Sequence, residues 1–393
     1  MQTKKAHPIR EFILKLLIIS VPFNSLGSPI PLVGLTLFIV LVFIILYFSI
    51  LLRPFSKKPL RNPLLLLITL YAILLISSAI NYEPLATGGF SFLRQFPTFI
   101  IMFYILSYAI INSYISFKQV MINYLWGMAI LSFLFAFGIS VSESDEGRMN
   151  VLEINSNALT VMTNTALLFI LNLIGKYRIK GAQFLMYICF IPVLLFITIS
   201  TGSRGGFFGL IIAIFVYFFF LKRNFQGKIK YFILGAVLLS LLTITFLSNE
   251  LIYNRIFNSN ESLANSRLPI WEVAYSVVSN DIFIGVGLFE YQVEMTQRMG
   301  RYFSVHNEYL AILIYSGILG FSLFIRFLYI AIKAAYNAYV NYENPIYLSL
   351  LALLMFALSN GGAFLLSTTT WFLIPIIMFP QYCKEYNQNN IKK

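Results

Sequence analysis

The one long stretch of this chain that is too polar for a bilayer begins at Asn249, where the sequence reads NELIYNRIFNSNESLANSRLPIWEVAYSVVSNDIFIGVGLFEYQ. It ends at residues 305–320, which read VHNEYLAILIYSGILG. The stretch carries four of the thirteen arginines and one of the two histidines. Charged groups lose their hydration inside a bilayer, at a large cost in free energy. We therefore expect residues 249–306 to form a large external, catalytic loop, held at a membrane surface by the apolar segments around it.

Composition places the rest of the chain in the membrane. The hydrophobic fraction is 59% and only 11% of the residues are charged, whereas a soluble domain carries about 25% charged residues. Apolar runs of about 20 residues, which suffice to cross a bilayer, recur along the sequence. We predict an all-α, polytopic membrane protein in which residues 1–393 form a single integral membrane domain. The two cysteines, Cys189 and Cys383, provide no disulfide framework and no metal-binding spacing.

Twelve segments are predicted to cross the membrane. They cover about residues 11–27, 30–52, 63–81, 95–113, 119–141, 157–175, 182–200, 205–222, 231–248, 307–330, 345–362 and 366–382. With a cytoplasmic N-terminus, 21 of the 28 basic residues fall at inner loops or inner helix ends, as the positive-inside rule requires. Both termini are therefore predicted to be cytoplasmic.

The basic residues that remain on the predicted outer face are all arginines. They are Arg94, Arg148, Arg204, Arg255, Arg267, Arg298 and Arg301. Membrane topology alone does not favour Arg over Lys, whereas the planar guanidinium suits bidentate recognition of phosphate or pyrophosphate. The alternative is that these arginines pair with acidic residues, since twelve of the fifteen also fall outside. The inner loops are short and contain no glycine-rich phosphate loop, so a cytoplasmic nucleotide-driven reaction is not expected.

A first candidate anion site is the sequence TGSRGG at residues 201–206, between the seventh and eighth predicted spans. Ser203 suits the N-cap of the eighth helix, whose N-terminus points outward. Gly205 and Gly206 would let a ligand approach the backbone, and the helix start together with the Arg204 guanidinium favours an anion. The alternative is a tight turn between helices with a capping serine.

A second candidate is NSRLPIW at residues 265–271, which leads to Gly285-Val286-Gly287. Ser266 and Pro269 indicate a helix start. Trp271, Ala274 and Val278 would then share one face of an amphipathic helix resting on the membrane interface, with Arg267 at headgroup height. The alternative is an ordinary interfacial helix whose arginine reaches the headgroups.

The third candidate is VHNE at residues 305–308, where the tenth predicted span begins. A helix N-terminus disfavours the imidazolium form, so the neutral ring of His306 is available as a base near pH 7. Asn307 is expected beside the substrate. Glu308 is either the competing base or the group that orients the ring.

These motifs together resemble the O-antigen ligase and O-antigen polymerase family. The resemblance rests on TGSRGG before a span, SRLPIW followed by GVGLF, and HNEYL running into SGILG, and it is most specific over residues 150–320. Residues 147–150, with Asn155 and Asn157, resemble the family's external loop before the sixth span. Many members carry a glutamate within the tenth helix where this chain has Tyr315.

The resemblance implies a GT-C-like glycosyltransferase architecture and transfer of glycans from an undecaprenyl diphosphate carrier at the outer face of the bacterial inner membrane. The motif residues that carry over are Arg204, Arg267 and His306. Arginines would stabilise the diphosphate leaving group, with Arg148 or Arg301 as helpers, and His306 would deprotonate the acceptor. Ser203, Gly205, Trp271, Asn307 and Glu308 are expected to line the substrate site.

We predict a reaction without metal or cofactor. Its donor would be a lipid-linked glycan, and its acceptor either another glycan, in a polymerase, or the lipid A–core, in a ligase. Polymerase is favoured over ligase. Membrane lipids and a chain-length regulator are further expected partners, and nucleic acid is not. A lipid-linked glycan transporter is the alternative from another class, but no ionisable residue lies at the centre of a predicted span.

Overall fold

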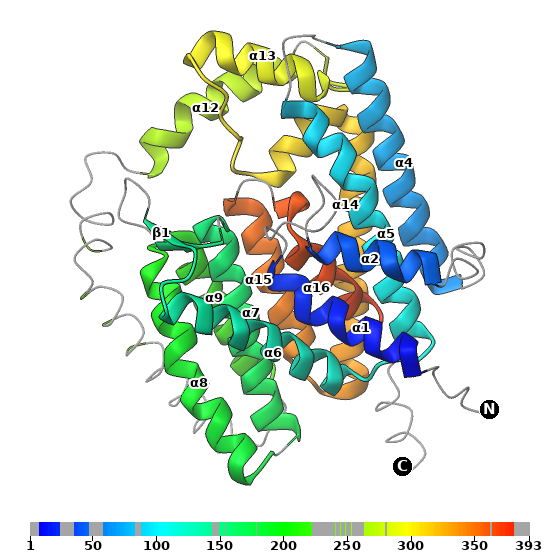
Figure 1. Ribbon diagram of the computed structural model, residues 1–393. Helices are drawn as coiled ribbons and strands as arrows, with labels where there is room; N and C mark the ends of the chain where they lie inside the picture. Colours follow the sequence, from blue (N-terminus) through cyan, green and yellow to red (C-terminus); the bar gives the residue numbers. More distant parts are fainter. Residues whose placement is uncertain are drawn as a thin grey trace.

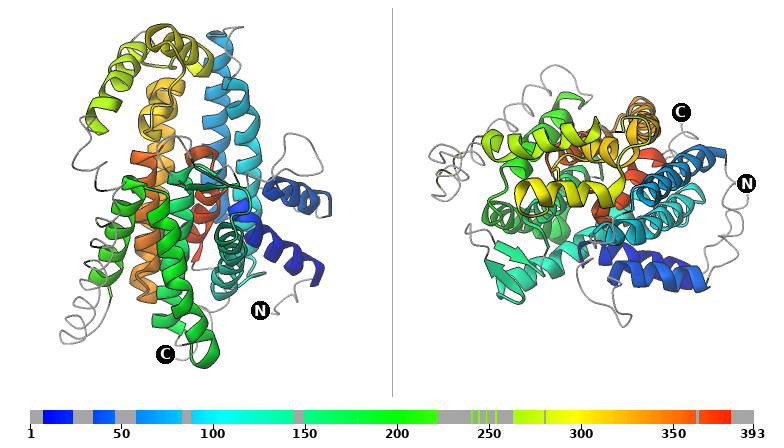
Figure 2. Two further views of the ribbon diagram at one scale, coloured as in Figure 1. Left: turned by 60° about the vertical axis from the view of Figure 1, so that its left-hand side comes forward. Right: turned by 90° about the horizontal axis from the view of Figure 1, so that it is seen from above.

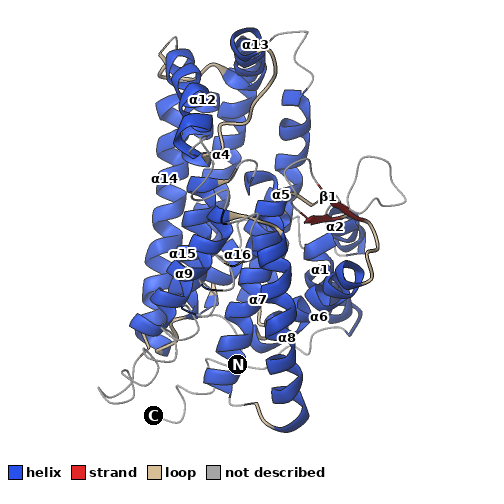
Figure 3. Ribbon diagram, turned by 90° about the vertical axis from the view of Figure 1, so that its left-hand side faces the viewer, coloured by secondary structure: helices blue, strands red, loops and turns tan. Residues whose placement is uncertain are grey.

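The computed structural model describes most of the chain. The described ranges are 8–23, 35–46, 58–82, 88–143, 149–152, 154–177, 179–221, 263–279, 281–361 and 364–380, with the single positions Ser240, Ile244, Ser248 and Tyr253. Nearly all of these residues are helical, as predicted, and one short β-hairpin is added to the helices (Figure 3).

The α-helices of the described ranges are α1 (Pro8–Ser20), α2 (Leu35–Leu46), α4 (Lys58–Ile80), α5 (Gly88–Ile111), α6 (Phe117–Ala136), α7 (Ser156–Tyr177), α8 (Gly181–Ser200), α9 (Arg204–Phe219), α12 (Leu263–Val278), α13 (Gly287–Met299), α14 (Glu308–Tyr342), α15 (Ile346–Asn360) and α16 (Thr368–Met378). Two 3₁₀ turns, η1 (Val21–Phe23) and η3 (Phe364–Leu366), complete them. Strands β1 (Val141–Glu143) and β2 (Met149–Val151) pair antiparallel, with Ser142 opposite Asn150.

All but one of the predicted spans coincide with a helix, and the ninth, 231–248, lies outside the described ranges except for single positions. Within the described ranges, six helices are long and apolar enough to cross a bilayer: α4, α5, α6, α7, α8 and α14. Helices α9, α15 and α16 are apolar but shorter. The chain is therefore a multi-pass helical membrane protein, and the number of twelve spans stays a prediction.

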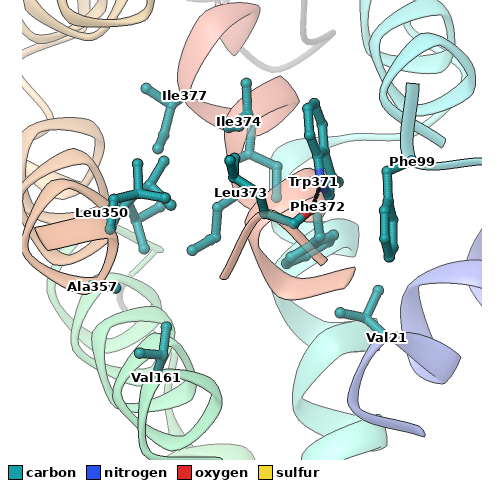
Figure 4. Packing of buried hydrophobic residues seen from close by; sticks show 14 of the residues in the cluster. Val21, Phe99, Val161, Leu350, Ala357, Trp371, Phe372, Leu373, Ile374 and Ile377 are labelled. Carbon is teal, nitrogen blue, oxygen red and sulfur yellow. Dashed lines mark hydrogen bonds between the residues drawn. The ribbon is translucent and has the colours of Figure 1, made fainter. Parts of the chain in front are cut away.

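Helix α16, predicted as the last span, is the centre of the core. Every one of its 11 residues is buried, and Trp371 stacks on Phe99 of α5 while Phe372 stacks on Tyr124 of α6 (Figure 4). The hydroxyl of Thr368 donates to the carbonyl of Val21, which joins this helix to the N-terminal segment. An 11-residue helix is only about 16 Å long. It therefore serves as a packing element for the helices that surround it.

Basic residues join the helix ends on the side predicted to be cytoplasmic. The Arg10 guanidinium lies 4.7 Å from the ring centre of Tyr114, and the Lys118 amine lies 5.8 Å from that of Tyr177. The Lys176 amine donates to the carbonyl of Tyr342 at the end of α14. These contacts place the ends of α5, α7 and α14 on the same side, as the charge distribution predicts.

Helix α14 is bent back on itself, so the prediction of a single crossing at 307–330 is wrong. Gly317 has φ 60° and ψ −166°, which no helix contains. In a straight helix the rings of Tyr309 and Phe324 would be about 22 Å apart, yet their centres are 6.0 Å apart. Residues 308–316 and 318–342 are thus two antiparallel limbs joined at Gly317. Hydropathy did not reveal the bend, because both limbs are apolar.

The bend also changes the assignment of Arg326, which the charge count placed at the inner end of a span. Arg326 is exposed and lies within the second limb, about 24 Å by helical rise from the end of that limb at Tyr342. Arg326 therefore does not lie at the end of that limb.

The bend is fixed by the GVG motif at residues 285–287. Backbone N–H groups of Val286 and Ile318 donate to the carbonyls of Ile314 and Ile282, at 2.9 Å each. The carbonyl of Gly285 accepts from Ser77 Oγ at 2.8 Å and from Asn81 at the end of α4. As a result α12 and α13 are fastened across one end of α4 and α14 (Figures 1 and 2).

We expect Gly317→Ala to destabilise the protein strongly. A left-handed backbone costs a non-glycine residue about 1–2 kcal/mol, and a Cβ at Gly317 would also collide with the carbonyl group of Phe283. Gly300 is the matched control, because its φ is 74° but a Cβ there meets nothing within 4 Å. Thermal unfolding in detergent should give a lower midpoint for Gly317→Ala than for Gly300→Ala. Equal midpoints would show that the bend is not tightly packed.

Candidate functional site

The site begins at the N-terminus of α9, where Ser203 is the N-cap, as predicted. Its Oγ accepts from the Gly206 N–H at 3.0 Å and donates to Asn157 Oδ1 on α7 at 2.7 Å. Gly206 is required here, because a Cβ would overlap the side chain of Thr160. The hydroxyls of Thr160 and Thr201 are also bonded to each other at 2.7 Å. Buried polar contacts between α7, α8 and α9 therefore fix this helix start.

A small, shallow recess opens at this helix start. Its polar lining residues are Asn157 and Asn360, together with the backbone of Gly205, Gly206 and Gly361, and the rest of its lining is apolar: Val161, Gly209, Leu353, Phe356 and Ala357. The first N–H groups of a helix have no acceptor within the helix, and Ser203 accepts from that of Gly206. The positive end of α9 beside this recess favours an oxyanion.

The second predicted arginine reaches the same place from another element. Arg267 of α12 donates from Nη2 to the carbonyl of Asn360 at 3.2 Å. Burial lowers the pKa of Arg267 from its ordinary value, but an arginine keeps its charge at neutral pH. The cost of burying this guanidinium falls if an anion binds beside it.

Asn360 is the residue at which the two predicted motifs meet. Its carbonyl holds Arg267, and a Cβ on Gly205 would lie 3.6 Å from its own Cβ. Arg204 is the first residue of α9 and is half-buried next to Gly205. The sequence analysis did not select Asn360 or Asn157 as site residues. The glycine pair Gly361-Gly362 directly after Asn360 was the sequence signal that a helix ends at this position.

Helix α12 corrects two details of the second motif. It begins at Leu263, so Pro269 lies inside it and does not mark its start. The face formed by Trp271, Ala274 and Val278 packs inward, with Ala274 fully buried, and does not rest on a membrane interface. The amphipathic pattern was real, but the apolar side is covered by protein from α13 and α14.

Trp271 connects α12 to the segment that carries His306. Its indole N–H donates to the carbonyl of Val305 at 3.0 Å. Trp271 lies one helical turn, about 5.4 Å, beyond Arg267 on α12. The predicted arginine and the predicted base are therefore attached to the same short helix. Trp271 acts here as a structural anchor.

His306 lies immediately before α14, as predicted. Asn307 is the N-cap, and its Oδ1 accepts from the Leu310 N–H at 3.1 Å. His306 has a φ of 53°, a left-handed conformation that is uncommon for a residue with a side chain. Such conformations persist only where the surrounding structure imposes them, and they are frequent at functional sites. The side chain is half-buried, with Nδ1 shielded from solvent.

Glu308 is buried under a cluster of tyrosines. It is only 3% exposed. Burial raises the pKa of Tyr302, and the nearby charge of Glu308 adds to this rise. Tyr291 packs edge-on against the rings of Tyr302 and Tyr315, with centres 6.2 Å and 5.7 Å away.

A family model described as O-antigen ligase matches residues 185–325. The matched segment covers 141 of the 393 residues. The match confirms the resemblance over α8, α9, α12, α13 and the bend of α14. No curated protein matches this sequence.

The matched segment contains Arg204, Arg267 and His306, but it does not contain the whole recess. Asn157 of α7 precedes the matched segment and Asn360 of α15 follows it. Each of these residues contacts a motif residue directly: Asn157 holds Ser203, and Asn360 holds Arg267. The helices outside the matched segment thus complete the site.

The remaining arginines of the predicted outer face have different environments. Arg301 is exposed and lies 4.5 Å from the ring centre of Phe303. Arg298 forms a 2.8 Å ion pair with Glu294, which supports the pairing alternative for that residue. Arg94 is exposed on α5. Arg148 and Arg255 lie outside the described ranges, so the proposed help from Arg148 stays a prediction.

Proposed function

We propose that this protein polymerises oligosaccharide repeat units carried on undecaprenyl diphosphate, at the outer face of the bacterial inner membrane. The observation that carries the proposal is that Arg267 and the N-terminus of α9 meet at Asn360, which lines a small recess beside that helix start. A diphosphate is the ligand that best suits two guanidinium groups next to a helix start. The match to the O-antigen ligase family supports the same substrate class.

In this mechanism the acceptor hydroxyl oxygen attacks the anomeric carbon of the donor. The bond from that carbon to the diphosphate breaks, and its electron pair stays on the phosphate oxygen. Arg204 and Arg267 stabilise the negative charge that grows there, more in the transition state than in the ground state. The N–H of Gly205 and the amide of Asn157 are further donors for it. The reaction is proposed to need no metal and no nucleotide.

His306 takes the proton of the acceptor hydroxyl in this scheme. Its Nδ1 atom is buried, so we assign the proton transfer to Nε2. Glu308 is a poor candidate for direct contact with an acceptor, because it is buried below Tyr302. We assign it the role of a fixed negative charge at the start of α14, where it stabilises the helix dipole and an imidazolium nearby.

A ligase that transfers the chain to the lipid A–core is the second candidate, and the description of the matching family favours it. The same site would serve both reactions, since only the acceptor differs. A GT-C-like architecture, cytoplasmic termini and association with a chain-length regulator belong to this proposal too.

The test is to reconstitute purified protein with the host's lipid-linked repeat unit as the only glycan substrate. A polymerase should convert it to lipid-linked products that grow by whole repeats and should release undecaprenyl diphosphate. The same assay with added lipid A–core tests the ligase. Growth that occurs only on lipid A–core would assign the ligase activity, and no product in either assay would contradict glycosyl transfer.

A further inference from the structure

The segment from Gly300 to Asn307, called here the strap, joins α13 to α14 and carries His306. It is held at two points. Trp271 donates to the Val305 carbonyl, and the Tyr291 hydroxyl donates to the Phe303 carbonyl at 3.3 Å. The strap is therefore a rigid segment beside the proposed base.

Tyr302 is an exposed aromatic residue on this strap, with 44% of the residue accessible. Tyr291, which is fully buried, supports the ring edge-on with centres 6.2 Å apart. An aromatic ring held at its edge loses little conformational entropy when a ligand covers it.

We infer that the ring of Tyr302 is a binding platform for a sugar of the acceptor glycan. A pyranose ring presents a face of C–H groups that packs on an aromatic surface, while its hydroxyls stay available to polar groups. The four residues from Tyr302 to His306 span at most about 14 Å of extended chain. A sugar on Tyr302 is therefore the one that carries the attacking hydroxyl, or one of the next two.

Other exposed aromatic residues of the outer elements do not have this arrangement. Tyr275 on α12 is 61% exposed and Phe283 before α13 is 67% exposed, but neither lies on the strap. The donor recess is formed by α7, α9 and α15, with Arg267 reaching it from α12. The recess proposed for the diphosphate and the ring proposed for the acceptor sugar therefore belong to different elements of the structure.

The experiment measures transfer from a fixed concentration of the lipid-linked donor to a soluble acceptor. The acceptor is the oligosaccharide that mild acid releases from the host's own lipid-linked repeat unit. Tyr302→Leu should raise the KM for this acceptor about tenfold, since it removes the aromatic face. Tyr302→Phe and Tyr302→Trp keep a ring and should stay within about twofold of wild type. The KM for the donor should be unchanged in all three.

Tyr275→Leu is the matched control, a tyrosine of similar exposure that should leave both KM values as in wild type. Thermal unfolding checks that each variant is folded, and Tyr302→Met replaces Tyr302→Leu if the latter is not. An acceptor KM that is unchanged in the aliphatic variant overturns the assignment. So does a Tyr302→Phe variant as impaired as Tyr302→Leu, because the hydroxyl would then be what matters. The inference rests on the proposed function, which fails separately if wild type transfers no glycan.

Discussion

His306→Asn should abolish glycan transfer and leave donor binding nearly intact. Loss of a general base lowers a rate by about 10²–10⁴-fold. Asparagine is the informative replacement, because it tolerates the left-handed backbone that His306 adopts, with φ 53°, but cannot accept the proton at neutral pH. Product formation by the reconstituted protein and binding of the lipid-linked donor would be measured together. Wild-type activity should also fall in acid, since an imidazolium cannot act as a base.

Two comparisons make the test of His306 decisive. His306→Ala removes the same base at a left-handed position, which Ala adopts less readily than Asn, so its thermal stability separates folding from chemistry. Glu308→Gln keeps the shape of the buried side chain and should retain partial activity. An active His306→Asn with an inactive Glu308→Gln would transfer the role of base to the carboxylate. Loss of donor binding in His306→Asn would make His306 a diphosphate ligand.

Arg204→Lys and Arg267→Lys should each lower transfer by roughly 10²-fold, the usual loss for one donor that stabilises transition-state charge. Lysine keeps the positive charge but cannot offer the planar pair of N–H groups. Nη2 of Arg267 already donates one hydrogen bond to the Asn360 carbonyl. We expect the remaining N–H groups of this guanidinium to bind the diphosphate. If both arginines bind one diphosphate, the double variant should lose less than the product of the two single losses.

Arg298→Lys is the matched control for these variants. Arg298 is an outer arginine as well, but it is exposed and forms a 2.8 Å ion pair with Glu294. An exposed pair of this kind contributes little, so transfer should be normal. Near-normal transfer by Arg204→Lys and Arg267→Lys, with folded protein in each case, would return both residues to a purely structural role. Destabilisation of either variant would be visible as a lower midpoint of thermal unfolding, and its transfer rate would then be expressed per folded protein.

The sequence by itself determined the class of the protein and the identity of its chemical groups. Apolar length alone places the helices, because in a bilayer each backbone polar group must be satisfied within its own helix. The Ser203 cap and the helix start after Asn307 were also readable, since capping depends on one or two adjacent residues. The motifs of Arg204, Arg267 and His306 indicated the family, which the match at residues 185–325 confirms.

Only the tertiary structure showed which of these side chains and helices lie next to one another. The bend at Gly317 could not be read from hydropathy, because it depends on hydrogen bonds to residues 282–286 that are distant in sequence. The apolar face of α12 was predicted correctly, but it was assigned to the membrane interface, whereas α13 and α14 cover it. An amphipathic pattern shows that a face is covered and does not show by what. Asn157 and Asn360 complete the recess through contacts to Ser203 and Arg267, which are 46 and 93 residues away in the sequence. Such contacts follow from the packing of whole helices, and no local sequence signal records them.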